Sequence, residues 1–254
     1  MKKAGVFFLM FLLLSGWAFL QAQEDLIVHK TTRMYGFNTN TPGGIISFPL
    51  ESPSSSELLH AEDSYLASAA AYAEGSYYVA LCNPDQTPYG IFAYDLKTGE
   101  RELLADMSAA PSIISEMTYD WTTQTMYVLG EDYPATSLMT LDLKTGELSV
   151  VATIDLKVYN TLACSPDGRL FVTESSGMLS ELDKETGLPT ELGDLRTYAQ
   201  GLQSMEFDYS TGKCYWAYTR YGSCALYEVD LESFTSKQVG SFPSNYQVVG
   251  LFPA

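Results

Sequence analysis

The heptapeptide Tyr94-Asp95-Leu96-Lys97-Thr98-Gly99-Glu100 returns almost unchanged as Leu141-Asp142-Leu143-Lys144-Thr145-Gly146-Glu147. Each copy is flanked by runs of alternating apolar residues, which is typical of half-buried strands. Glycine at the sixth position supplies the positive φ of a tight turn between two antiparallel strands. A motif that recurs with a period in the forties indicates a copied supersecondary unit of a propeller or a solenoid.

Three weaker copies extend this repeat along the chain. They are Leu182-Asp183-Lys184-Glu185-Thr186-Gly187, then Val229-Asp230-Leu231-Glu232-Ser233-Phe234 with Phe in place of Gly, and a degenerate first copy, Phe48-Pro49-Leu50-Glu51-Ser52-Pro53. Upstream of the turns, strand–turn–strand patterns recur, as in 117–128 and 205–216. This pattern predicts four strands in each unit. They are named A to D from the inside outward, and the acidic turn lies between C and D.

Five such units predict an all-β fold, a five-bladed β-propeller of four-stranded antiparallel blades. The segment 33–37 matches strand B of the later units, and 247–251 resembles an unpaired strand A. We therefore expect the C-terminal strand to complete the first blade and close the ring. The alternatives are a six-bladed or irregular propeller, and an inner first strand at 26–28.

The N-terminus has the pattern of a signal peptide. Lys2 and Lys3 precede an apolar run over 6–20, and Ala22 is a small residue suited to cleavage. This pattern predicts a signal peptide over 1–22 and a single propeller domain over 23–254; an uncleaved anchor helix is the alternative. The expected location is secreted, periplasmic or at the cell surface.

Charge and cysteine content narrow the classes of partner. The chain carries a net charge of −17 and shows no basic run, which argues against nucleic acid and anionic membranes as partners. Its four cysteines lack the spacing of a disulfide framework or a metal pair, so we interpret most of them as small buried residues. They are Cys82, Cys164, Cys214 and Cys224. No cofactor or metal is expected.

The segment Ser165-Pro166-Asp167-Gly168-Arg169-Leu170-Phe171-Val172 and the Asp-Leu-x-Thr-Gly turns resemble the secreted bacterial propellers grouped as YVTN, NHL and quinoprotein-like repeats. The resemblance covers nearly all of the expected mature chain. It implies a propeller fold and leaves the activity open, because one fold hosts many functions.

Tyrosines gather in the expected B–C and D–A loops, which share one face of a propeller. They are Tyr65, Tyr89, Tyr133, Tyr159, Tyr198, Tyr221 and Tyr246, with Asn40, Asn83, Asp85, Asp132, Asn160 and Asn245 beside them. Exposed Tyr clusters are typical of recognition surfaces, so this face predicts binding of a glycan or a peptide. The alternative is that these rings cover the core between blades.

Signs of catalysis are sparse. There are two His residues and no G-x-S-x-G motif. Ala199-Gln200-Gly201-Leu202 resembles part of the Gln-Gly-Leu motif of plant-type glutaminyl cyclases, but the Glu of that family is absent among 215–218. Three carboxylates, Glu116, Glu174 and Glu206, lie on expected A or B strands and could reach a central channel, as glycosidases require. We favour solvated rim positions for Glu116 and Glu206.

The sequence thus predicts an exported, non-enzymatic binding or scaffold propeller whose partner is a glycan, a peptide or a surface protein. The alternative is a hydrolase or a glutaminyl-cyclase-like enzyme with carboxylates at the central channel. A third possibility is a subunit that acts only within an assembly.

Overall fold

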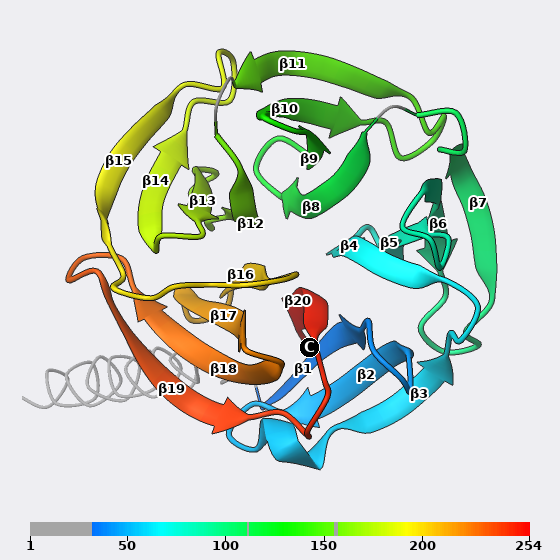
Figure 1. The fold of residues 1–254 in the computed structure, drawn as a ribbon, viewed down its shortest axis with the longest axis horizontal. Coiled ribbons are helices and arrows are strands. Elements are labelled where there is room, and N and C mark those ends of the chain that lie inside the picture. The colour runs from blue at the N-terminus through cyan, green and yellow to red at the C-terminus, as the bar shows by residue number, and fades with distance from the viewer. Residues whose placement is uncertain (1–31, 111, 155–156) are drawn as a thin grey trace, which may run out of the picture. The chain divides into compact units, whose positions relative to one another are not determined.

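The computed structural model describes residues 32–254, except for 111, 155–156 and the side chain of 132. Five four-stranded antiparallel sheets stand around a central axis, and in each the innermost strand faces that axis (Figure 1). The fold is therefore the predicted five-bladed β-propeller. The expected signal peptide, 1–22, and the alternative inner strand at 26–28 lie outside the described residues.

The strands follow one another from the axis outward in each blade. Blade 1 comprises β20 (Val248–Pro253), β1 (Arg33–Asn38), β2 (Gly44–Pro49) and β3 (Glu57–Ala61), with a short 3-10 helix, η1 (Pro53–Ser55), before β3. Blade 2 comprises β4 (Leu66–Ala73), β5 (Ser76–Cys82), β6 (Pro88–Tyr94) and β7 (Arg101–Asp106), and blade 3 comprises β8 (Ile113–Asp120), β9 (Thr125–Asp132), β10 (Ala135–Leu141) and β11 (Leu148–Ile154). Blade 4 comprises β12 (Tyr159–Cys164), β13 (Leu170–Glu174), β14 (Met178–Leu182) and β15 (Pro189–Asp194), and blade 5 comprises β16 (Ser204–Asp208), β17 (Lys213–Arg220), β18 (Ser223–Asp230) and β19 (Thr235–Ser241).

The two ends of the propeller meet in blade 1. Strand β20 pairs antiparallel with β1, with Val249 opposite Phe37. Backbone hydrogen bonds from Thr39 N to Gln247 O (2.8 Å) and from Ala254 N to Arg33 O (3.0 Å) extend the pairing at both ends. The expected closure by the C-terminal strand is confirmed, and it removes the open sheet edge that would invite association with other chains.

The repeated Asp residue ends strand C by capping its turn. Asp142 Oδ1 accepts hydrogen bonds from the backbone N–H groups of Lys144 and Thr145, both at 2.8 Å. These bonds stabilise the carboxylate and lower the pKa of Asp142. Asp95, Asp183 and Asp230 cap the turns of blades 2, 4 and 5 in the same way. The motif that identified the fold therefore has a local structural role.

Each C–D turn also packs on the outer strand of the preceding blade. A Cβ at Gly146, in blade 3, would overlap the Leu104 carbonyl of blade 2. In blade 5 the turn carries the large residue and the outer strand of blade 4 carries the glycine. The ring of Phe234 occupies the space that a side chain at Gly193 would need. Blade 1 completes the circuit, since Pro53 lies where a side chain at Gly240 of blade 5 would stand.

The centre of the ring is packed with small or apolar side chains. Ala69, Ala70 and Ala71 of β4 are buried, as are the strand methionines Met117 and Met126. Cys82, Cys164, Cys214 and Cys224 are buried free thiols, as we interpreted them. Within the described part of the chain, no helix has the length and apolar character to cross a bilayer.

Replacing Gly146 by Ala tests the contact between blades. Gly146 and Gly212 adopt nearly the same positive φ, 74° and 72°, but a Cβ at Gly212 would meet nothing within 4 Å. We expect Gly212→Ala to cost about 1–2 kcal/mol for the backbone conformation alone. Gly146→Ala should cost at least about 1 kcal/mol more, because its Cβ meets the neighbouring blade. Urea unfolding of both variants measures the difference, and equal losses would contradict the contact.

Candidate functional site

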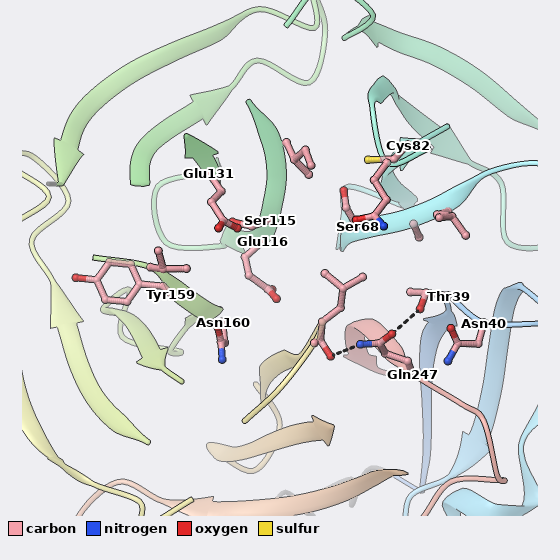
Figure 2. A pocket seen from close by; sticks show the side chains of 17 residues that line it. Thr39, Asn40, Ser68, Cys82, Ser115, Glu116, Glu131, Tyr159, Asn160 and Gln247 are labelled. Carbon is pink, nitrogen blue, oxygen red and sulfur yellow. Dashed lines mark hydrogen bonds between the residues drawn. The ribbon is translucent and has the colours of Figure 1, made fainter. Parts of the chain in front are cut away.

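A cavity of about 510 Å³ opens at the end of the central channel on the face that carries the B–C and D–A loops, called here the loop face (Figure 2). The first residues of the inner strands form its walls together with the last residues of the second strands. Its volume lies within the range of about 300–1,000 Å³ that small-molecule sites occupy. This cavity is called the mouth cavity below.

Three inner strands place a polar side chain at the same level of the mouth cavity. Ser68, Ser115 and Asn160 each stand where the pairing of the inner strand with its neighbour shifts by one residue. Such a bulge leaves one residue unpaired and redirects its side chain. The Ser68 and Ser115 hydroxyls donate long hydrogen bonds to backbone carbonyls, and the Asn160 amide donates to Ser175 Oγ at 3.1 Å. Ser175 Oγ also donates to Asn160 Oδ1 at 3.3 Å. Each of these oxygens keeps a lone pair that a ligand can use.

The closing strand supplies a second polar wall. Gln247 Nε2 donates to Leu202 O at 3.3 Å, and Gln247 Oε1 accepts from Thr39 Oγ1 at 3.4 Å (Figure 2). Beside it, Asn40 Nδ2 donates to Asn245 O at 2.8 Å. These bonds orient both amide side chains, so the wall is formed before any ligand arrives.

Glu116 lies at the floor of the mouth cavity and points toward the centre of the ring (Figure 2). Its exposed fraction is 3%, so the expectation of a solvated rim residue is wrong for this side chain. Burial raises the pKa of Glu116 well above its usual range, the carboxyl of Glu206 raises it further, and a hydrogen bond from the Leu162 backbone opposes the shift. Burial therefore favours the protonated form of Glu116.

Glu206 of β16 is half-buried in the channel and is not among the residues that line the mouth cavity. Its carboxylate accepts a hydrogen bond from Phe207 N at 2.8 Å, and Thr118 Oγ1 donates to it at 3.5 Å. Burial raises the pKa of Glu206 to about 8, against these two hydrogen bonds. The structure thus brings two of the three candidate carboxylates together.

The third carboxylate, Glu174, lies apart from this pair. It forms an ion pair with Lys157, whose Nζ also lies 3.7 Å from Glu191. Both acids belong to blade 4, Glu174 at the end of β13 and Glu191 within the outer strand β15. Glu174 is therefore occupied in an ion pair and does not line the mouth cavity.

The seven candidate tyrosines divide into two groups. Tyr133, Tyr221 and Tyr198 are 81%, 75% and 50% exposed. Tyr65 stacks on Tyr89 with ring centroids 4.2 Å apart, and both pack against the core between blades 1 and 2. Tyr159 is buried, and its hydroxyl points away from the centre of the cavity (Figure 2). Tyr246 is half-buried on blade 1's side of the rim.

The polar loop residues divide in a similar way. Asn40 and Asn160 line the mouth cavity, whereas Asp85 accepts from the backbone and hydroxyl of Thr87, and Asn83 donates to that same hydroxyl. The side chain of Asp132 lies outside what the structure describes. Among the described residues, no three of His, Cys, Asp and Glu gather as a metal site would require.

Sequence reasoning missed Ser68, Ser115 and Gln247. The available signal was one polar residue at the same position after each D–A loop, as in Ala67-Ser68-Ala69 and Tyr159-Asn160-Thr161. The described residues that line the mouth cavity include two acids, Glu116 and Glu131, and no Lys or Arg. This lining disfavours an anionic ligand and suits a neutral one with hydroxyl or amide groups.

Comparisons of the fold find other β-propellers. A chain of a nidogen/laminin complex aligns with a TM-score of 0.56 and 12% identity, covering 86% of this chain and 97% of that one. TolB from Acinetobacter baumannii aligns at 0.54 and 15% identity, covering 83% of this chain and 53% of TolB. A luciferin-regenerating enzyme aligns at 0.52 and 13%, covering 87% and 74%.

These likenesses establish the class of protein, a β-propeller, and nothing finer, because one such fold carries many activities. No model of a known protein family matches the chain, and no curated protein matches its sequence.

Replacing Glu206 by Gln tests the buried carboxyls through the pH dependence of stability. The folded state keeps a proton on Glu206 up to about pH 8, whereas the unfolded state releases it at about pH 4.3. The free energy of unfolding therefore falls as the pH rises between these values. We expect Glu206→Gln to weaken this fall, because each tenfold difference in proton affinity between the two states corresponds to about 1.4 kcal/mol.

Thermal or urea unfolding at pH 5, 7 and 8.5 measures the effect. Glu102→Gln is the control, because Glu102 is exposed on the outer strand β7. If the free energy of unfolding depends on pH in the same way for the wild type and for Glu206→Gln, the pKa of Glu206 is not raised in the folded state.

Proposed function

We propose that this protein is an exported, non-enzymatic binding propeller that holds a glycan in its mouth cavity. The observation that carries the proposal is the set of uncharged polar side chains in that cavity, with Ser68, Ser115 and Asn160 at one level and Gln247 opposite. Hydroxyl and amide groups of this kind donate and accept hydrogen bonds to sugar hydroxyls.

The apolar part of the lining supports the same class of ligand. Leu66, Ile113, Val158 and Leu202 stand beside the polar groups. A sugar ring has apolar C–H faces as well as hydroxyls, so it matches a wall that alternates in this way. A peptide remains the alternative ligand on this face. Export rests on the basic and apolar pattern over 1–22.

Binding of neutral saccharides tests the proposal. The mature protein is screened on a glycan array, and each ligand found is measured by calorimetry. We expect Asn160→Ala to weaken binding about 3- to 10-fold, the usual effect of losing one hydrogen-bonding partner. Tyr133→Ala is the control, because Tyr133 is 81% exposed and does not line the mouth cavity. The proposal fails if no saccharide binds, or if Asn160→Ala binds as the wild type does.

The position of Glu116 favours a second candidate, a hydrolase or cyclase. A buried carboxyl with a raised pKa beside a second carboxyl can act as a general acid. Gly201 and Leu202, from the segment that resembles the cyclase motif, also line the cavity. Turnover of nitrophenyl glycosides or of peptides with N-terminal Gln, lost in a folded Glu116→Gln variant, would establish this candidate in place of simple binding.

A further inference from the structure

A shallow groove of about 240 Å³ lies beside the mouth cavity, at the rim between blades 5 and 1. The two spaces share Asn40, Gly201 and Gln247 as lining residues, so they are adjacent. The outer part of the groove lies between Tyr221 and Tyr246, with Thr219 beside them.

The junction between cavity and groove is rigid. Gln247 is held by hydrogen bonds to Leu202 O and Thr39 Oγ1, and its backbone N–H donates to Asn38 Oδ1 at 3.0 Å. Gly201 adopts a φ of 71°, and a Cβ there would lie 2.5 Å from Gln247 Nε2. Glycine therefore lets the chain pass close to the amide without displacing it. The opening exists without rearrangement.

Tyr221 offers a flat aromatic surface at the outer end of the groove. It stands in the B–C turn of blade 5 and is 75% exposed. The guanidinium of its neighbour Arg220 lies 4.8 Å from the centre of the Tyr221 ring and so restricts the ring on one side. An aromatic ring that is held in place loses little entropy when a ligand stacks on it.

Side chains from several blades narrow the channel beneath the cavity. Thr118 of blade 3 and Glu206 of blade 5, which are not neighbouring blades, meet across the axis at 3.5 Å. Thr118 Oγ1 also accepts a hydrogen bond from Cys164 N of blade 4 at 3.0 Å. On the other side, a Cβ at Gly250 would overlap Ala70. These contacts oppose the passage of a chain-like ligand through the ring.

We propose that the site binds a neutral oligosaccharide by its end, with the terminal sugar in the mouth cavity and the following units in the groove, stacked on Tyr221. The inference rests on the proposed glycan function. It adds the orientation in which the oligosaccharide binds and the number of sugar units that the site holds. The narrowed floor of the cavity favours an end of the chain, and the adjacent groove offers a place for the units that follow.

The groove favours an oligosaccharide over a peptide. The described residues that line it are amides, hydroxyls, glycines and two tyrosines, with no charged side chain. Amides on either side of an aromatic ring suit a ligand with hydroxyls at its edges and apolar C–H groups on its faces.

Calorimetry with glucose, xylose and mannose oligomers of one to five units tests the inference, with tetra-alanine as the peptide probe. For the series that binds, we expect the affinity to rise from one unit to about three and then to level off. Tyr221→Ala should remove most of this gain, about 3- to 10-fold, and leave the affinity for the monosaccharide unchanged. Tyr133→Ala is the matched control, an equally exposed tyrosine that lines neither space.

Stoichiometry separates binding at an end from binding along the chain. One protein per oligomer is expected at every length, because each chain has one end of the required kind. Affinity independent of length, an equal loss for the monosaccharide in Tyr221→Ala, or several proteins on one long chain would overturn the inference while leaving the proposed function intact. Binding of tetra-alanine and of no saccharide would overturn both.

Discussion

The contact of each C–D turn with the outer strand of the preceding blade is the constraint on which the ring depends. A turn that ends in glycine brings its backbone against the neighbouring strand, as Gly146 does at Leu104. Where the repeat departs from glycine, the partner changes with it, as in the pair of Phe234 and Gly193. Five such contacts in sequence, with β20 closing blade 1, leave no sheet edge open.

Closure of the ring also creates the site. Strand β20 carries Gln247 to the end of β1, where Thr39 and Asn40 stand, although more than 200 residues separate them in the chain. The inner strands of the blades converge on the channel and bury the side chains that face it. Burial in this environment raises the pKa of Glu116 well above its usual range and the pKa of Glu206 to about 8.

Much of the fold could be predicted from the repeat, whereas the site could be predicted only in part. The turns at 95–99 and 142–146 located every blade, and with them the face on which the loops gather. Which loop tyrosines reach solvent depended on the packing of neighbouring blades, so Tyr65 and Tyr89 stack within a core while Tyr221 stands free at the rim. The bulges at Ser68 and Ser115 could not be predicted from the alternation of apolar and polar residues, because one extra residue preserves the apolar pattern on either side of it.

The sequence by itself predicted five blades, the order of strands within each and the acidic turns of blades 2 to 5, because these follow from alternation and turn chemistry within about 46 residues. The tertiary structure alone decided which carboxylates influence one another, which tyrosines are exposed and where the mouth cavity and the groove lie. Glu116 and Glu206 stand on blades 3 and 5, and Gln247 faces residues from the opposite end of the chain. Such proximities depend on the angle at which five blades close around one axis, which no local pattern records.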